Sequence, residues 1–245
     1  VLDGFTVTSG NADAASNSYN SFGGGMLNVN ASVTVNNCNF TLNTSSFTAG
    51  AVYNGITFNS VFTNCRFINN SSLAAGAMAN SGFAPAVSST TLTDCEFIGN
   101  TAQSGGGAIN NGFSNTDGIS NMEFLNCIFR DNICHNRSTL GTGGAYQSQN
   151  VGFDATFINC LFDGNKALGT ADDGGGALMI YAGAVTLVNS TIVNSESATH
   201  GGAISVWNAN GSIDIKNSIL WNNAAISENS VSNGNGGTAS AEYSL

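Results

Sequence analysis

Apolar and polar residues alternate along this chain in short runs. The segments "SVTV" (32–35), "AVTLV" (184–188) and "SIDI" (212–215) switch between the two kinds at nearly every residue. A period of two is typical of short β-strands that bury one face. Leucines at helical spacing are absent. The pattern therefore predicts an all-β protein and argues against helical and leucine-rich repeats.

One motif recurs along the chain, an asparagine or aspartate followed by cysteine and, two residues later, by phenylalanine. Serine replaces the cysteine in the last two copies, and successive copies are 27 to 33 residues apart. The copies include "FTNCRFINN" (62–70), "LTDCEFIGN" (92–100), "FLNCIFRDN" (124–132), "FINCLFDGN" (157–165), "LVNSTIVNS" (187–195) and "IKNSILWNN" (215–223).

A second motif, two small residues (mostly glycines) and alanine followed by an apolar residue, alternates with the first. Its clearest copies are "GGAI" (106–109), "GGAL" (175–178) and "GGAI" (201–204). Two motifs that alternate at a period near thirty residues indicate a solenoid.

The local period of two makes this solenoid a parallel β-helix of about seven to eight coils, forming a single domain over residues 1–245. Three strands are expected in each coil: one before the Asn-Cys pair, one through Cys-x-Phe and one through Gly-Gly-Ala-Ile. With coils about 4.8 Å apart, the stack is about 35–40 Å long.

Equivalent residues of successive coils should stack into inward-facing ladders. This requires a bend between Asn37 and Cys38, so that both point inward. The expected ladders are asparagine or aspartate (Asn37, Asn64, Asp94, Asn126, Asn159, Asn189, Asn217), cysteine (Cys38, Cys65, Cys95, Cys127, Cys160) and phenylalanine (Phe40, Phe67, Phe97, Phe129, Phe162).

Two further features of the repeat are expected to shape the coil. A second asparagine follows each phenylalanine by three residues, at 43, 70, 100, 132, 165 and 223 (three after Leu220), and should fix the next bend. The glycine pair should let the backbone turn sharply or approach a neighbouring coil closely.

The charge balance narrows the possible partners. Only 8% of residues are charged, and five bases oppose 15 acids for a net charge of −10. No basic patch is available to neutralise phosphates, so nucleic-acid binding is not expected. No apolar run approaches the roughly 18 residues of a membrane span, so this segment is not expected to insert into a bilayer.

The cysteine series allows a chemical and a packing interpretation. Its members are about thirty residues apart with no histidine beside them, which is not zinc-ligand spacing. A buried column of small apolar thiols, replaceable by serine, explains the series better. Neighbouring rungs are close enough for a disulfide on distance alone. Cys134 lies off the ladder in "NICHNRS" and is expected to be an exposed or packed thiol.

Candidate catalytic and metal-binding groups are scattered. We expect no catalytic residue, no bound cofactor and no metal, except a weak calcium candidate at Asp172 and Asp173 in "ADDGGG", for which an acidic turn is the simpler interpretation. No opposed pair of carboxylates for glycoside hydrolysis can be identified. Threonines such as Thr34, Thr91 and Thr186 form no regular two-column array, so ice binding is the weakest alternative.

The alternation of Phe-x-x-Asn, as in Phe97–Asn100 and Phe129–Asn132, with Gly-Gly-Ala-[Ile/Leu/Val] resembles the repeats of bacterial polymorphic outer-membrane proteins and related surface β-helix proteins. The opening "VLDGFTVTSGN" also looks like the first coil of secreted right-handed β-helix repeat proteins. The resemblance covers almost the whole chain. It implies right-handed winding, a secreted or cell-surface location and a frequently adhesive role. Ile192 and Leu220, in place of phenylalanine, depart from the pattern.

The favoured function is therefore a non-enzymatic extracellular or cell-surface structural element: a stalk, an adhesin passenger or an end-to-end fibre subunit. Its expected partners are other copies of itself or neighbouring surface proteins, with glycans also open. The loops 133–143 and 167–174 are the expected contact regions. The segment is expected to belong to a longer repeat protein or to stack into fibres, since no cap is evident at either end. The alternative is a carbohydrate-active β-helix enzyme, a polysaccharide lyase or hydrolase.

Overall fold

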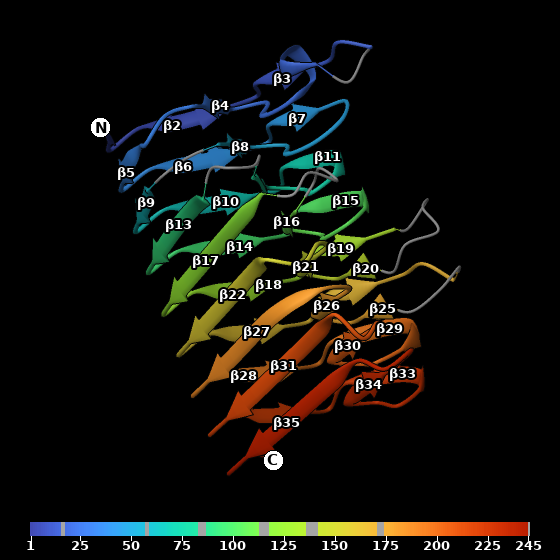
Figure 1. The fold of residues 1–245 in the computed structure, drawn as a ribbon. Helices are drawn as coiled ribbons and strands as arrows, with labels where there is room; N and C mark the ends of the chain where they lie inside the picture. Colours follow the sequence, from blue (N-terminus) through green and yellow to red (C-terminus); the bar gives the residue numbers. More distant parts are fainter. Residues whose placement is uncertain are drawn as a thin grey trace.

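The computed structural model describes residues 1–15, 18–56, 59–82, 87–112, 118–135, 142–170 and 174–244. Over these residues the chain forms a parallel β-helix of about seven turns, in which every paired strand runs parallel to its equivalent in the next turn (Figure 1). The predicted all-β parallel solenoid is confirmed. Each full turn supplies a strand to each of four sheets, which we name A to D in chain order.

Sheet A is built from the alternating runs. Its inward column includes Val35, Phe62, Leu92, Phe124 and Phe157, all fully buried. Its strands are, in spatial order, β1 (Leu2–Asp3), β5 (Thr34–Asn36), β9 (Ser60–Thr63), β13 (Val87–Thr93), β17 (Ile119–Leu125), β22 (Phe153–Ile158), β27 (Gly183–Val188), β31 (Gly211–Lys216) and β35 (Thr238–Glu242).

Sheet B carries the phenylalanine of the first motif. Each strand is three residues long, and its middle residue points into the core. Its strands are β2 (Thr6–Thr8), β6 (Asn39–Thr41), β10 (Arg66–Ile68), β14 (Glu96–Ile98), β18 (Ile128–Arg130), β23 (Leu161–Asp163), β28 (Thr191–Val193) and β32 (Ile219–Trp221).

Sheet C supplies a fourth strand in each coil, so the prediction of three strands per coil is wrong. Its strands are short and rich in Ser, Thr and Ala, so they lack the apolar contrast that reveals a strand in a sequence. They are β3 (Asn11–Ala12), β7 (Thr44–Ser45), β11 (Ser71–Ala74), β15 (Thr101–Ser104), β19 (Ile133–Cys134), β24 (Lys166–Ala167), β29 (Glu196–His200) and β33 (Ala224–Ser227).

Sheet D follows the glycine motif and is buried on both faces in its central strands. Its strands are β4 (Met26–Val29), β8 (Val52–Gly55), β12 (Met78–Ser81), β16 (Ile109–Asn111), β21 (Tyr146–Ser148), β26 (Leu178–Ile180), β30 (Ile204–Val206) and β34 (Val231–Asn233). A two-stranded sheet, β20 (Thr142–Gly143) with β25 (Gly174–Gly175), and a 3-10 turn, η1 (Tyr19–Ser21), lie between sheets C and D.

The corner between sheets A and B corrects the predicted direction of the first asparagine ladder. Its members have left-handed backbones, with φ from 48° to 55°, and their side chains are exposed. Asparagine and aspartate tolerate this conformation better than most residues. The left-handed residue breaks the alternation, so it faces solvent while the following cysteine faces the core. The corrected residues are Asn37, Asn64, Asp94, Asn126, Asn159, Asn189 and Asn217.

The second glycine of the Gly-Gly motif brings neighbouring coils into contact, as expected. A Cβ atom on Gly144 would overlap the carbonyl oxygen of Gly176, and one on Gly176 would overlap that of Gly202. The column therefore needs glycine for close backbone approach, although these glycines do not have positive φ.

Candidate functional site: the axial columns

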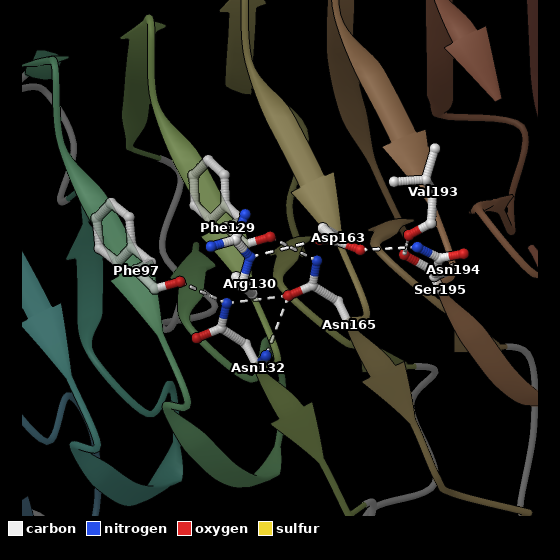
Figure 2. Close-up of polar contacts among 9 residues, drawn as sticks. All are labelled: Phe97, Phe129, Arg130, Asn132, Asp163, Asn165, Val193, Asn194 and Ser195. Atoms are coloured by element: carbon white, nitrogen blue, oxygen red, sulfur yellow. Dashed lines mark hydrogen bonds and ion pairs between the residues drawn. The ribbon is translucent and has the colours of Figure 1, made fainter. Parts of the chain in front are cut away.

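The second asparagine of the repeat forms a hydrogen-bonded column inside the sheet B–sheet C corner (Figure 2). Asn132 Oδ1 accepts from the backbone N–H of Asn100 at 3.0 Å and from its Nδ2 at 2.9 Å. Asn132 Nδ2 in turn donates to Phe97 O and to Asn165 Oδ1, both at 2.9 Å. One buried carboxamide thus ties together neighbouring coils on both sides.

The same arrangement repeats along the axis. Asn43 and Asn70 each donate to the Oδ1 of the next asparagine at 3.0 Å. Ser195 interrupts the column, but its backbone N–H still donates to Asn223 Oδ1 at 3.0 Å. These asparagines lie at a bend, as expected, because each follows a left-handed residue such as Asn69 or Asp131. That the asparagines themselves fix the bend stays a prediction.

Phenylalanine rings stack in a second column beside the asparagines. The rings of Phe67 and Phe97 have centroids 4.6 Å apart and planes within 4° of parallel. Phe129 continues the stack 4.7 Å from Phe162 and meets Phe157 of sheet A edge to face. All five predicted phenylalanines, from Phe40 to Phe162, are fully buried. Ile192 and Leu220 extend the column in sheet B.

Five cysteines form a third column at the inner side of the sheet A–sheet B corner. They are free thiols with exposed fractions of 3% or less. Each donates to the carbonyl oxygen two residues earlier, from 3.0 Å for Cys38 to 3.5 Å for Cys127. Ser190 and Ser218 continue the column, and the hydroxyl oxygen of Ser190 accepts from Cys160 N at 3.0 Å. The column is Cys38, Cys65, Cys95, Cys127 and Cys160.

The stacked sulfurs alter one another's acidity. Hydrogen bonding to the sulfur of the next rung is the largest cause that raises the pKa of Cys95 and of Cys127 to about 12. The contact with the preceding sulfur lowers the pKa of both thiols and burial raises it, so the net direction is upward. The contact with the next sulfur and burial also raise the pKa of Cys65. At the last sulfur the direction reverses, because the contact with Cys127 lowers the pKa of Cys160. These four thiols therefore form one coupled unit.

Cys134 is packed rather than exposed. It faces inward from β19, is fully buried and pairs in register with Ala102 and Ala167 on adjacent coils. It therefore occupies a small-residue column of sheet C, separate from the five-thiol column. The calcium candidates Asp172 and Asp173 lie outside the described residues.

Sequence reasoning missed a further buried asparagine column in sheet D. Asn28 Nδ2 donates to Asn54 Oδ1 at 2.9 Å, and Asn54 Nδ2 donates to Asn80 Oδ1 at 3.1 Å. The signal was present, because an asparagine comes two residues after the apolar residue of the glycine motif in "GGMLN", "GAVYN" and "GAMAN".

The outer faces carry ion pairs between neighbouring coils. Arg66 pairs with Glu96 at 2.8 Å and Lys166 with Glu196 at 2.9 Å, all with partly exposed side chains. Within the described ranges, no three metal-ligating side chains converge, and no helix is long and apolar enough to cross a membrane.

A shallow hollow lies on the outer face of sheet A, where Thr91, Asn121, Glu123 and Thr156 contribute to its lining. The predicted absence of a regular threonine array holds for one outward column of sheet A. Thr34, Thr91 and Thr186 lie in this column together with Thr156, but Val61, Glu123 and Asp214 occupy its other positions.

Comparison with known proteins adds no relative to this description. A scan against protein-family models, a search of curated proteins and a search of solved structures each found no match.

Proposed function

We propose that this chain is a non-enzymatic structural element of an extracellular or cell-surface protein: a stalk, an adhesin passenger or an end-to-end fibre subunit. The observation that carries the proposal is the buried asparagine column, in which Asn70, Asn100, Asn132 and Asn165 bond from coil to coil. Buried hydrogen bonds directed along the axis oppose bending and shear between coils. Such a rod holds its surface at a fixed distance from an attachment point.

The resemblance to repeats of bacterial polymorphic outer-membrane proteins supports the surface location in this proposal. The acidic charge is compatible with it, because a net charge of −10 disfavours contact with anionic membranes. The proposed contact regions are the segments 133–143 and 167–174. Their ends belong to strands, since Cys134, Thr142 and Ala167 are buried, and residues 136–141 and 171–173 lie outside the described residues. Proposed partners are other copies of the chain, neighbouring surface proteins or glycans.

Surface exposure is tested with antibodies against the purified chain. They should label intact source cells or their secreted matrix, and brief protease treatment of intact cells should remove the signal. Labelling that requires permeabilised cells would overturn the proposed location. Beads coated with the chain, compared with albumin-coated beads, then test adhesion to cells and to glycan surfaces. Electron microscopy of the concentrated protein tests for fibres.

A carbohydrate-active enzyme is the second candidate, and the hollow on sheet A favours it. Glu123 there lies among the hydroxyl and amide groups of Thr91, Asn121 and Thr156, which suit hydrogen bonding to a sugar. Assays of lyase and hydrolase activity on acidic and neutral glycans, with and without calcium, separate the candidates. Turnover that Glu123→Gln abolishes would replace the structural proposal.

A further inference from the structure

Every rung of the five-thiol column, from Cys38 to Cys160, is a cysteine. The strands on either side of Cys65 and Cys95 are in register, with Thr63 opposite Thr93 and Arg66 opposite Glu96. The same flanking register connects every other neighbouring pair of the column. Neighbouring parallel strands are about 4.8 Å apart, so successive cysteines are one such step apart along the axis.

That step matches the span of a linear metal dithiolate. A zinc–thiolate bond is about 2.3 Å long, so two bonds of this length in a straight line place their sulfurs about 4.6 Å apart. Soft closed-shell ions select thiolates over oxygen ligands, and several of them prefer two ligands in a line. Two adjacent rungs supply this ligand set, whereas tetrahedral zinc needs four ligands and, among the described residues, not even three metal-ligating side chains converge.

We propose that adjacent rungs of the column bind a soft, two-coordinate metal ion between their sulfurs, and that Hg²⁺ is the best-matched ion. Binding breaks two S–H bonds, forms two metal–sulfur bonds and releases two protons to solvent. A divalent ion and two thiolates make a neutral unit, which suits a site without exposed surface. Ag⁺ or Cu⁺ would leave one negative charge buried in the apolar core, which is costly.

The column limits how many ions it holds. A sulfur that binds an ion on one side would have to bind a second ion on the opposite side, in line with the first, and the two cations would repel each other. Each thiol therefore serves one ion, and five consecutive thiols hold two ions with one thiol left over. An ion cannot bridge a missing rung, because the sulfurs on either side of it are about 9.6 Å apart, twice the strand spacing.

This limit makes the result of each substitution depend on the position of the rung. Removal of the first, third or fifth thiol (Cys38, Cys95 or Cys160) leaves two adjacent pairs and hence two ions. Removal of Cys65 or Cys127 leaves one thiol without a neighbouring thiol and three thiols in a row, which hold one ion. Serine is a suitable replacement, since Ser190 and Ser218 already continue the column.

The test titrates the folded chain with HgCl₂ in a Cys134→Ser background, which removes the separate buried thiol. A serine already occupies the same sheet C column at Ser197, in register with Ala167. Bound mercury is counted by native mass spectrometry and elemental analysis after excess ion is removed with a weak competing ligand. X-ray absorption measures the number of sulfurs per ion, and circular dichroism checks that the β-helix persists.

The expected result is two ions for the background protein and for the Cys38→Ser, Cys95→Ser and Cys160→Ser variants. One ion is expected for Cys65→Ser and Cys127→Ser, with two sulfurs per ion throughout. An equal number of ions in all five variants would overturn the proposal. So would no uptake, one ion per thiol, or uptake that occurs only with loss of the β-sheet signal.

Discussion

Replacing Asn132 by alanine tests whether the buried asparagine column holds the coils together. The substitution removes the two hydrogen bonds that its Oδ1 accepts from Asn100 and the two that its Nδ2 donates to Phe97 O and Asn165 Oδ1. At roughly 1 kcal/mol net for each buried hydrogen bond, the loss is about 4 kcal/mol. This is a large fraction of the stability of an ordinary domain.

The assay is urea unfolding followed by circular dichroism, with hydrogen exchange as a local readout. The amide of Asn100 donates to the carboxamide that is removed, so its protection should fall more than that of amides in distant coils. Asn126→Gly is the matched control, because Asn126 is exposed and glycine accepts its φ of 55°. The control should lose less than about 1 kcal/mol.

The reasoning is refuted if Asn132→Ala and Asn126→Gly destabilise the protein equally. Unchanged protection of the Asn100 amide in Asn132→Ala would refute it as well. Either result would mean that the stacked carboxamides contribute no more than exposed ones do, and that the rod depends on its apolar columns alone.

Three further predictions concern the other columns and the surface. Gly144→Ala should prevent folding or cost more than about 3 kcal/mol, measured by urea unfolding, because its Cβ would overlap the Gly176 carbonyl oxygen. Phe129→Ala should cost about 3–5 kcal/mol in the same assay, because it leaves a cavity in the ring stack. The ion pair with Lys216 lowers the folded-state pKa of Asp214. The small contribution of this pair to the free energy of unfolding is therefore present above the unfolded value of 3.8 and is lost as the pH falls through the folded pKa. Below pH 4, the free energy of unfolding measured in urea should fall by a salt-sensitive amount, and this fall should be absent in Asp214→Asn.

The sequence predicts the solenoid and two of its inward columns because these depend on strong local signals. A phenylalanine such as Phe40, between the polar residues Asn39 and Thr41, is expected to face the core, and a cysteine that serine replaces is expected to occupy a small buried space. The direction of Asn37 could not be predicted in the same way. Its side chain points out because its φ is 53°, and a left-handed residue interrupts the alternation on which the expectation rested.

Sheet C and the sheet D asparagines escaped prediction for a different reason. Strands such as β7 (Thr44–Ser45) contain no large apolar residue, so the two faces differ little in composition. Asn54 lies in a strand that is buried on both faces, where polar residues are not expected. The burial of Asn54 is explained by its hydrogen bonds to Asn28 and Asn80 on the adjacent coils, which a single-strand pattern does not reveal.

The coils of this chain provide an internal comparison of what each corner requires. At the exposed corner between sheets B and C, the left-handed position is occupied by Ser9, Leu42, Asn69, Gly99, Asp131, Gly164, Asn194 and Asn222. The next position is glycine (Gly10) in the first of these coils; in the seven coils that follow it faces inward and is asparagine six times and serine once. The exposed position demands only a tolerated backbone conformation, so it varies. The buried side chain accepts two hydrogen bonds from one neighbouring coil and donates one to each of the two neighbouring coils. The carboxamide of asparagine supplies two donors and two acceptor sites, whereas the hydroxyl of serine supplies a single donor. Serine at 195 retains the backbone donor to Asn223 but lacks the carboxamide, so we expect the junction between the coils of Asn165 and Ser195 to be the weakest in the column. Ser195→Asn should therefore raise the protection of the Asn165 amide in hydrogen exchange, and no gain there would show that the column tolerates the gap without loss.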